Sequence, residues 1–111
     1  MKVVFVNSER IGAGDDELGT KLMGSFLYSL ARTPNKPGAV VFMNGGVRLT
    51  CEGSAALGDI RLLAGDGVPI YSCGTCLDWL GIKDRLAVGE VGNMNDTLAL
   101  FMDADDVVTV G

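Results

Sequence analysis

Short runs of mostly apolar residues alternate along this chain with longer stretches in which apolar residues recur every three or four positions. The runs are Val3–Val6, Ala39–Met43, Val68–Tyr71 and Asp106–Val110. Uninterrupted β-branched runs of this length are typical of strands buried on both faces of a parallel sheet. Leu86–Val88 is a candidate for one further strand, although its periodicity alone does not distinguish a strand from a loop.

The stretch between the first two strands predicts a helix that packs one face on the sheet. Its apolar stripe recurs every four residues and comprises Leu18, Leu22, Phe26 and Leu30, widened by Met23 and Leu27. The helix should end before Pro34. Three acids behind a glycine turn, Asp15–Glu17, would repel a phosphate, so we interpret them as stabilising the helix start.

Two further helices are predicted by their end signals. One runs from Ser54, as its N-cap, to Gly65, as the glycine just past its end. The other follows Asn93 as N-cap, with Met94, Leu98 and Phe101 on one face.

Strands and helices alternate throughout, which implies a parallel sheet with helices on both faces. We expect one α/β domain spanning residues 1–111, a three-layer α/β/α fold with a five-stranded, mostly parallel sheet. Functional loops in such sheets lie at the carboxyl ends of the strands. These loops are Ser8–Gly14, Asn44–Cys51, Ser72–Cys76 and roughly Gly89–Asn93, so all three cysteines fall on that edge.

The charge narrows the classes of partner. The chain has a net charge of −5, and its nine basic residues are scattered. Nucleic acids and anionic membranes attract clustered Lys and Arg, so we expect neither as a partner. The apolar run after Lys2 is too short for a signal-peptide core or a membrane span, so we expect a cytoplasmic protein.

The chain has three cysteines and no histidine. Three cysteines cannot all pair internally, so thiol chemistry is a more natural interpretation than a disulfide scaffold. A closed structural zinc site normally needs four Cys or His ligands, so we expect no metal or cofactor within one chain. Without an imidazole, Ser-His and Cys-His catalysis are also excluded.

One segment combines reactive side chains with a local structure that would activate them, namely Cys73-Gly74-Thr75-Cys76 after the third strand. Thr75 is predicted to cap a helix with Asp78 at its third position, which places Cys73 just ahead of the helix N-terminus. Unpaired N–H groups there favour a thiolate, while Asp78 opposes it. Gly74 lets the backbone approach a ligand. The alternative is that both cysteines only pack, and we favour the functional interpretation.

Other residues at this edge are weaker candidates. Cys51 is either a supporting thiol or a core residue. The turn Asn44-Gly45-Gly46 could offer backbone N–H groups to an anion. Arg10 and Arg48 could steady a thiolate or could remain solvated, and Trp79 is interpreted as a core or interface residue.

Several motifs occur in a consistent order along nearly the whole chain. They are Gly14–Gly19 with Leu22-Met23, Asn44–Thr50 with Glu52-Gly53-Ser54, Ser72–Leu77, and Val88-Gly89 with Asn93-Met94. Together they resemble the DsrE/DsrF-like family, most closely the DsrE-like domain of YedF-type proteins, which are described as sulfurtransferase-like and linked to selenium metabolism. The Cys73–Leu77 turn is the most specific part of the resemblance.

The resemblance implies a five-stranded parallel sheet, homo-oligomers that are commonly trimers or hexamers, and a persulfide on the cysteine after the third strand. Cys73 stands at that position, whereas Cys76 belongs to the YedF-like pattern. YedF-type proteins usually carry a preceding TusA-like domain. The resemblance therefore implies a sulfur donor or acceptor protein as partner, such as a TusA-like domain, with this chain either stand-alone or an isolated domain.

The leading hypothesis is a sulfur or selenium carrier or transferase. In it the Cys73 thiolate takes up and passes on sulfur, the backbone around Gly74 to Cys76 stabilises the anion, and Cys76 resolves the persulfide. Two alternatives stay open. One is a dithiol redox switch, and the other is a non-catalytic oligomeric accessory domain, including one with a metal–thiolate site between subunits.

Overall fold

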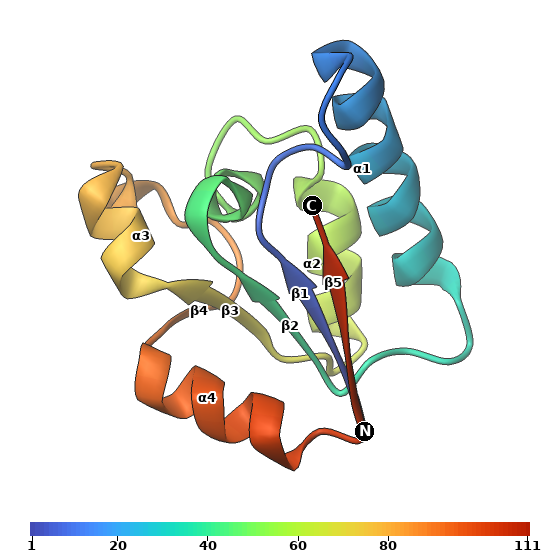
Figure 1. The fold of residues 1–111 in the computed structure, drawn as a ribbon, viewed down its shortest axis with the longest axis vertical. Helices are drawn as coiled ribbons and strands as arrows, with labels where there is room; N and C mark the ends of the chain where they lie inside the picture. Colours follow the sequence, from blue (N-terminus) through green and yellow to red (C-terminus); the bar gives the residue numbers. More distant parts are fainter.

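The computed structural model describes residues 1–111 as a five-stranded sheet in which every pairing is parallel (Figure 1). The strands are β1 (Lys2–Val6), β2 (Ala39–Phe42), β3 (Ile70–Cys73), β4 (Glu90–Gly92) and β5 (Asp106–Val110). Their order across the sheet is β4-β3-β2-β1-β5. This confirms the α/β fold with a five-stranded parallel sheet.

Helices cover both faces and the carboxyl edge of this sheet. Two of them, α1 (Asp16–Arg32) and α2 (Leu57–Gly65), pack on one face, and α4 (Met94–Asp103) packs on the other (Figure 1). At the carboxyl edge lie α3 (Gly74–Trp79) and the 3₁₀ helices η1 (Asn44–Thr50) and η2 (Lys83–Arg85). No helix is both long enough and apolar enough to span a membrane.

The fourth strand lies later in the sequence than predicted, at Glu90–Gly92 instead of Leu86–Val88. Leu86 forms an isolated antiparallel bridge with Cys51, so this segment is already held by the end of η1. The chain then turns at Gly89, whose φ is +80° and where a Cβ would lie 2.5 Å from a backbone oxygen of β3. Only after this close approach does the chain pair with β3.

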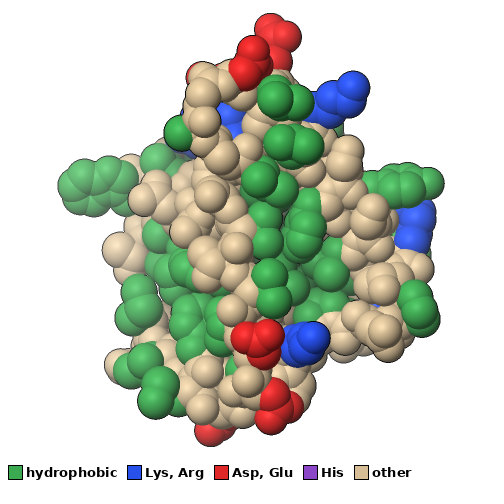
Figure 2. Space-filling view, turned by 45° about the vertical axis from the view of Figure 1, so that its right-hand side comes forward, with side chains coloured by type: hydrophobic (Ala, Val, Ile, Leu, Met, Phe, Trp, Pro, Cys, Tyr) green, Lys and Arg blue, Asp and Glu red, His purple; other side chains and the backbone are tan.

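The buried face of α1 is displaced from the predicted stripe. Its buried residues are Gly19, Met23, Leu27 and Ala31. Leu18 and Leu22, which the prediction placed on the sheet, are 54% and 43% exposed. The other four residues of the predicted stripe are buried or pack against the core, so the prediction failed only for these two. Phe26 and Leu30, further along the stripe, line a groove of about 450 Å³ beside Val108 of β5. Figure 2 shows an apolar band on this side of the molecule.

The N-caps of α1 and α4 follow the predicted chemistry. The carboxylate of Asp15 accepts a hydrogen bond from the N–H of Leu18 at 2.9 Å. The side chain of Asn93, predicted as a cap, accepts from the N–H of Asp96 at 2.9 Å. In both cases a side-chain oxygen satisfies a donor that the helix leaves unpaired.

Both predicted ends of α2 were wrong by two or three residues. The Ser54 hydroxyl accepts from the N–H of Ala56 in a local turn, and the helix begins only at Leu57. Gly65 is the last helical residue, and Gly67, with φ of +90°, takes the left-handed position that ends the helix.

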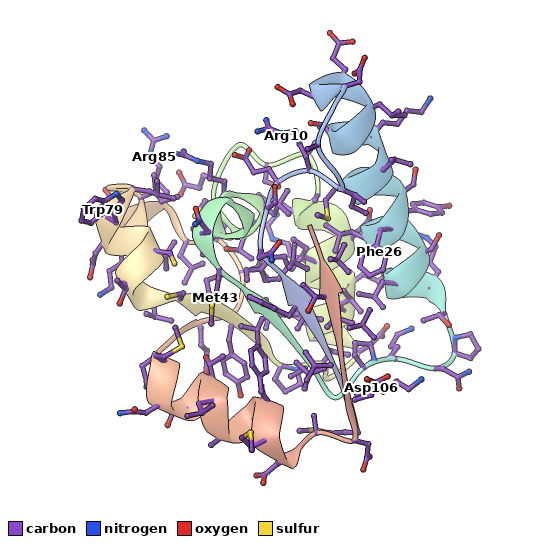
Figure 3. The ribbon with its side chains drawn as sticks, in the orientation of Figure 1. Arg10, Phe26, Met43, Trp79, Arg85 and Asp106 are labelled. Carbon is purple, nitrogen blue, oxygen red and sulfur yellow. The ribbon has the colours of Figure 1, made fainter.

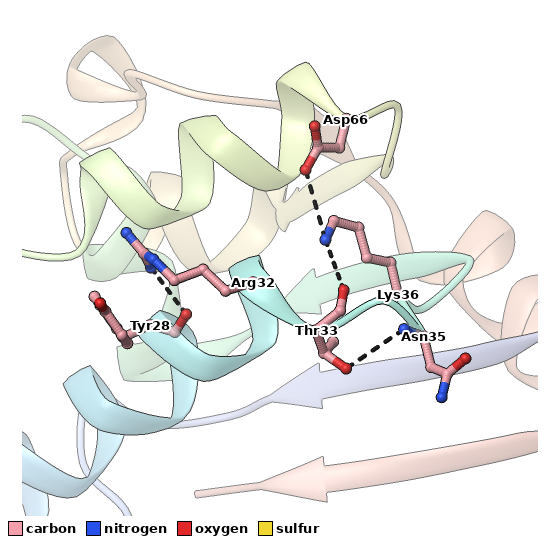
Figure 4. A network of polar contacts seen from close by, with 6 residues as sticks. All are labelled: Tyr28, Arg32, Thr33, Asn35, Lys36 and Asp66. Carbon is pink, nitrogen blue, oxygen red and sulfur yellow. Dashed lines mark hydrogen bonds and ion pairs between the residues drawn. The ribbon is translucent and has the colours of Figure 1, made fainter.

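The last turn of α1 is tied down by a polar network (Figure 4). The guanidinium of Arg32 donates to the carbonyl of Tyr28 at 2.9 Å and lies 3.6 Å from the centre of its ring. The Lys36 amine donates to the carbonyl of Thr33 at 2.7 Å and lies 3.6 Å from Asp66, just past α2. These partly exposed contacts fix how the chain leaves α1 and serve the fold.

The two faces of the sheet are buried unequally. The face under α1 and α2 contributes to a cluster of 18 buried residues. On the other face the cluster has three buried residues, Val3, Ala39 and Val41, against which Phe101 packs. Met94 and Leu98, predicted to share one helix face with Phe101, are 61% and 57% exposed. Thus α4 covers its face through Leu100, Phe101 and Ala104 and leaves an apolar outer side.

Candidate functional site

The predicted cysteine turn lies where β3 passes directly into α3. The helix begins at Gly74, so Cys73 is its N-cap residue and no side chain caps it. The predicted cap by Thr75, with Asp78 as its partner, is therefore wrong. Gly74 is pressed against the neighbouring strand, since a Cβ there would lie 2.9 Å from Val91 Cγ1. This close packing allows the helix to begin at the strand end, one residue before the expected cap.

The two cysteines of this turn differ in exposure. Cys73 is only 7% exposed, whereas Cys76 is half-buried. The two thiols are close enough for Cys73 to raise the pKa of Cys76. The Cys76 Sγ also accepts a hydrogen bond from the backbone N–H of Asn44 at 3.1 Å. Cys76 is thus the thiol that solvent and a reaction partner can reach, with Cys73 behind it.

Asn44 is held in an unusual backbone conformation where it meets the thiol. Its φ is +49°, the only positive φ among the non-glycine residues. Asparagine tolerates this region better than most residues do. The turn from β2 into η1 therefore directs the N–H of Asn44 toward the Cys76 sulfur in the turn after β3.

The local environment disfavours ionisation of Cys76. Burial raises the pKa of its thiol, and the neighbouring Cys73 thiol raises it further, while the N–H of Asn44 lowers it in part. No cationic side chain is among these causes. Near neutral pH Cys76 is therefore a protonated thiol whose thiolate, once formed, has one backbone donor.

The same sulfur borders a small open pocket. The pocket has a volume of about 220 Å³ and is lined by Asn44, Thr75, Cys76, Trp79 and Leu80. Trp79 is 88% exposed and projects from the outer end of α3 (Figure 3). Of the two interpretations of Trp79, core residue and interface residue, this exposure excludes the core. Its position three residues after Cys76, on the same helix face, was the signal that could have linked the two.

Cys51 lies at the same edge of the sheet but in a different setting. It is 4% exposed, and its thiol donates to the carbonyl of Val47 at 3.3 Å. Burial raises its pKa, and the Thr50 hydroxyl, Arg48 and Arg85 oppose that rise. Of the two interpretations left open, a core residue and a supporting thiol, its burial and hydrogen bond fit the core residue.

The glycines after Asn44 serve packing. A Cβ on Gly46 would lie 2.4 Å from the carbonyl oxygen of Val6, and the Gly46 N–H donates to the carbonyl of Met43 at 2.9 Å. Gly45 lies beside Glu9, whose carboxylate would discourage an anion there. The one N–H group of this turn that reaches the thiols belongs to Asn44.

The two candidate arginines are paired with acids on the surface. Arg48 Nε lies 3.6 Å from Glu9 Oε1, and Arg10 Nε lies 3.7 Å from Asp16 Oδ1. Both side chains are substantially exposed. The alternative of solvated arginines therefore fits both residues better than support of the Cys76 thiolate.

A pair of buried hydroxyls, missed from the sequence, joins η1 to β3 beneath the site. Thr50 Oγ1 donates to the carbonyl of Val47 at 2.9 Å and lies 2.7 Å from Ser72 Oγ. Because the Thr50 proton is already used, the Ser72 hydroxyl is the donor between the two oxygens. Both residues are 0% exposed, so this contact fixes the turn that carries Asn44 against the strand that carries Cys73.

Within this chain, no group of three or more His, Cys, Asp or Glu side chains is placed to hold a metal ion.

No protein-family model and no curated protein sequence matches the chain. Solved structures do match it. YchN from E. coli has a TM-score of 0.73 at 20% identity over 97% of each chain. The protein of unknown function MTH1491 from Methanobacterium thermoautotrophicum has a TM-score of 0.70 at 24% identity, also over 97% of each chain. BT1422 from Bacteroides thetaiotaomicron, also of unknown function, has a TM-score of 0.64 at 11% identity, over 98% of this chain and 94% of its own.

At these identities the likeness establishes the fold. The chain has the DsrE/DsrF-like fold that its motifs led us to expect. The more specific likeness to YedF-type proteins rests on the sequence motifs.

Proposed function

We propose that this chain is a sulfur carrier that holds a transferable sulfur as a persulfide on the Cys73–Cys76 pair. The observation that carries the proposal is the half-buried Cys76 thiol, which accepts the N–H of Asn44 at 3.1 Å and has a second thiol beside it. The DsrE/DsrF-like fold supports it. A donor protein, such as a TusA-like domain, would deliver the sulfur.

Loading is a substitution at sulfur with no net oxidation. The Cys76 thiolate attacks the outer sulfur of the donor persulfide, a new S–S bond forms, and the donor leaves as a thiolate that takes up a proton. Cys73 can then attack the inner sulfur of the Cys76 persulfide. That step forms the Cys73–Cys76 disulfide and releases hydrogen sulfide, so two thiols are oxidised as the transferred sulfur is reduced.

The exposures of Cys73 and Cys76 favour the opposite assignment of the receiving and resolving thiols to the one expected from the sequence. The resemblance placed the persulfide on Cys73, yet that residue is 7% exposed and does not line the pocket. Cys76 lines the pocket and has the backbone donor. We therefore propose Cys76 as the receiving thiol and Cys73 as the resolving thiol.

Peptide mass spectrometry after incubation with a persulfide donor tests both the function and the order. We expect the added sulfur at Cys76, its loss in Cys76→Ser, and its retention without disulfide formation in Cys73→Ser. Cys51→Ser is the matched control and should load normally. Sulfur on Cys73 in the Cys76→Ser chain would restore the order expected from the sequence. Absence of sulfur from both cysteines, under conditions that load a known carrier, would contradict the proposal.

A dithiol redox switch is the second candidate, because the two thiols are neighbours. The two functions differ in what titration against glutathione buffers should show. A switch forms the Cys73–Cys76 disulfide reversibly without a sulfur donor, whereas a carrier forms it only after loading. The same persulfide incubation, repeated with a selenium donor, addresses the selenium chemistry implied by the YedF-type resemblance.

We further propose that the chain forms homo-oligomers through the apolar band beside β5. The band includes Phe26, Leu30 and Val108, which line one groove, and the exposed Leu18 and Leu22 of the same helix. Figure 2 shows a strip of hydrophobic side chains on this side of the molecule. Sedimentation of Leu22→Asp tests this, with Leu62→Asp on the far helix as matched control. We expect only Leu22→Asp to lower the mass of the assembly, and equal masses would exclude this surface.

A further inference from the structure

We infer that the pocket beside Cys76 selects sulfur donors whose group next to the reactive sulfur is apolar and uncharged, and that Trp79 is the residue responsible. The inference rests on the proposed function, because it names the class of donor that the receiving thiol accepts. The pocket is open to solvent, about 220 Å³ in volume, and has Cys76 in its wall.

The walls of the pocket are suited to an apolar group. Trp79 and Leu80 supply hydrophobic surface on the side of α3, and Thr75 and Asn44 supply the polar remainder. Trp79 is 88% exposed, more than any other large hydrophobic residue of the chain. Covering an indole ring with an apolar group removes this surface from water and is favourable.

The charges near the pocket would not attract an anionic donor. The cation close to α3, Lys83, is paired with Asp78 at 3.5 Å. Arg48 is paired with Glu9. Arg85 has no acidic partner, but like Arg48 it acts on the Cys51 thiol and is not among the groups that shift the pKa of Cys76. The chain as a whole carries a charge of −5. An anion such as thiosulfate therefore meets no cation that acts on the receiving thiol and is repelled at longer range.

Disulfide exchange with two aromatic probes measures this selectivity. In each, the Cys76 thiolate attacks one sulfur of the probe, a mixed disulfide forms, and one aromatic thiolate leaves. The neutral probe is 4,4′-dithiodipyridine, and the dianionic probe is 5,5′-dithiobis(2-nitrobenzoate). The measured quantity is the rate at which the first mixed disulfide forms at Cys76. Peptide mass spectrometry locates that disulfide, and the rest of the chain is left unchanged.

We expect the neutral probe to react faster than the dianionic one, relative to their rates with a free thiol in the same buffer. Trp79→Ala should reduce the rate of the neutral probe about 3- to 10-fold and leave the other nearly unchanged. Trp79→Phe should retain most of the rate. Tyr28→Ala removes an exposed aromatic ring from α1 and should change neither rate. Equal relative rates, or no effect of Trp79→Ala, would overturn the inference.

A second arm separates a small apolar donor from a polypeptide donor. Persulfides of the dipeptides Phe-Cys and Ala-Cys are compared with the persulfide of an alkyl thiol. Faster loading by Phe-Cys than by Ala-Cys points to a peptide segment, and fastest loading by the alkyl persulfide points to a small molecule. If no persulfide loads Cys76, the proposed function fails, while the selectivity in disulfide exchange still decides the role of Trp79.

Discussion

The turns that follow the neighbouring strands β2 and β3 both lead to a cysteine, but the two thiols are held in opposite ways. At the end of η1, after β2, the Cys51 thiol is buried and donates its proton to the carbonyl of Val47. In α3, after β3, the Cys76 thiol is half-buried and accepts the N–H of Asn44. A thiol that donates must stay protonated, whereas the N–H that Cys76 accepts would stabilise a thiolate there, against the burial that raises its pKa. The direction of one hydrogen bond, together with exposure, separates a packing cysteine from a reactive one.

The largest expected effect comes from Gly46→Ala in η1. The new methyl carbon would lie 2.4 Å from a backbone oxygen of β1, so either the strand or the turn must move. We expect a loss of stability of about 3 kcal/mol or more, the upper range for overpacking. Urea unfolding measures it. Gly58→Ala is the matched control, because no atom apart from the backbone of its own helix lies within 4 Å of that methyl, and it should gain about 0.5–1 kcal/mol. Equal stabilities would mean that η1 is not seated on β1 as described.

Alkylation of the native protein by a neutral reagent compares the two thiols directly. We expect Cys51 to react on the order of 100-fold more slowly than Cys76, because its sulfur is reached only when η1 opens locally. Peptide mass spectrometry gives both rates in one experiment. In urea the rates should converge, which is the control. Similar rates in the native protein would remove the distinction between the two turns.

The two hydroxyls that join these regions, those of Thr50 and Ser72, are expected to contribute unequally to stability. Thr50→Val removes the acceptor of the buried Ser72 hydroxyl, so it should cost about 1–3 kcal/mol. Ser72→Ala should cost less, because Thr50 still donates to the carbonyl of Val47. In the double variant no hydroxyl is left unpaired, so its loss should be smaller than the sum of the two single losses. The reverse ranking of the single variants would mean that the donor has been assigned wrongly.

The smallest effect is a dependence of stability on alkaline pH. The pKa values of Cys51 and Cys76 are raised in the native state, mainly by burial. Below the ordinary thiol pKa of about 8.5 both states keep these protons, and pH has no effect through them. Above it the unfolded chain loses its protons first, so the native state binds more protons and stability falls as pH rises. Cys51→Ala should flatten the slope of unfolding free energy between about pH 8 and 10, and an unchanged slope would contradict the assignment.

Much of the fold could be predicted because β1, β2 and β3 are largely buried and therefore consist of short apolar runs. The side chains of Asp15 and Asn93 cap their helices through bonds to residues three positions on, which are local in the sequence. The position of β4 could not be predicted, because the segment before it is held by a distant one: the residues on either side of Cys51 bond to the backbone of Arg85 and Ala87. The buried side of α1 depends in the same way on where the edge of the sheet ends.

The candidate site was predicted in its location but not in its detail. The cysteine turn was placed correctly after β3, because spacing and strand end are local signals. The donor from Asn44 and the bond between Thr50 and Ser72 join segments about 20 to 30 residues apart, for which one sequence holds no signal. Thr75 failed as a cap because Gly74 can approach β4 closely enough to begin the helix itself.

The strand order also has a consequence for how the chain is made. Strand β1 is synthesised before the other four strands, yet it lies between β2 and β5, and Lys2 pairs with Asp106 in β5. Contacts between such distant segments slow folding. We therefore expect β2, β3 and the cysteine turn to assemble while one edge of β1 is still unpaired. The docking of β5 on that edge should be the late, rate-limiting step of folding.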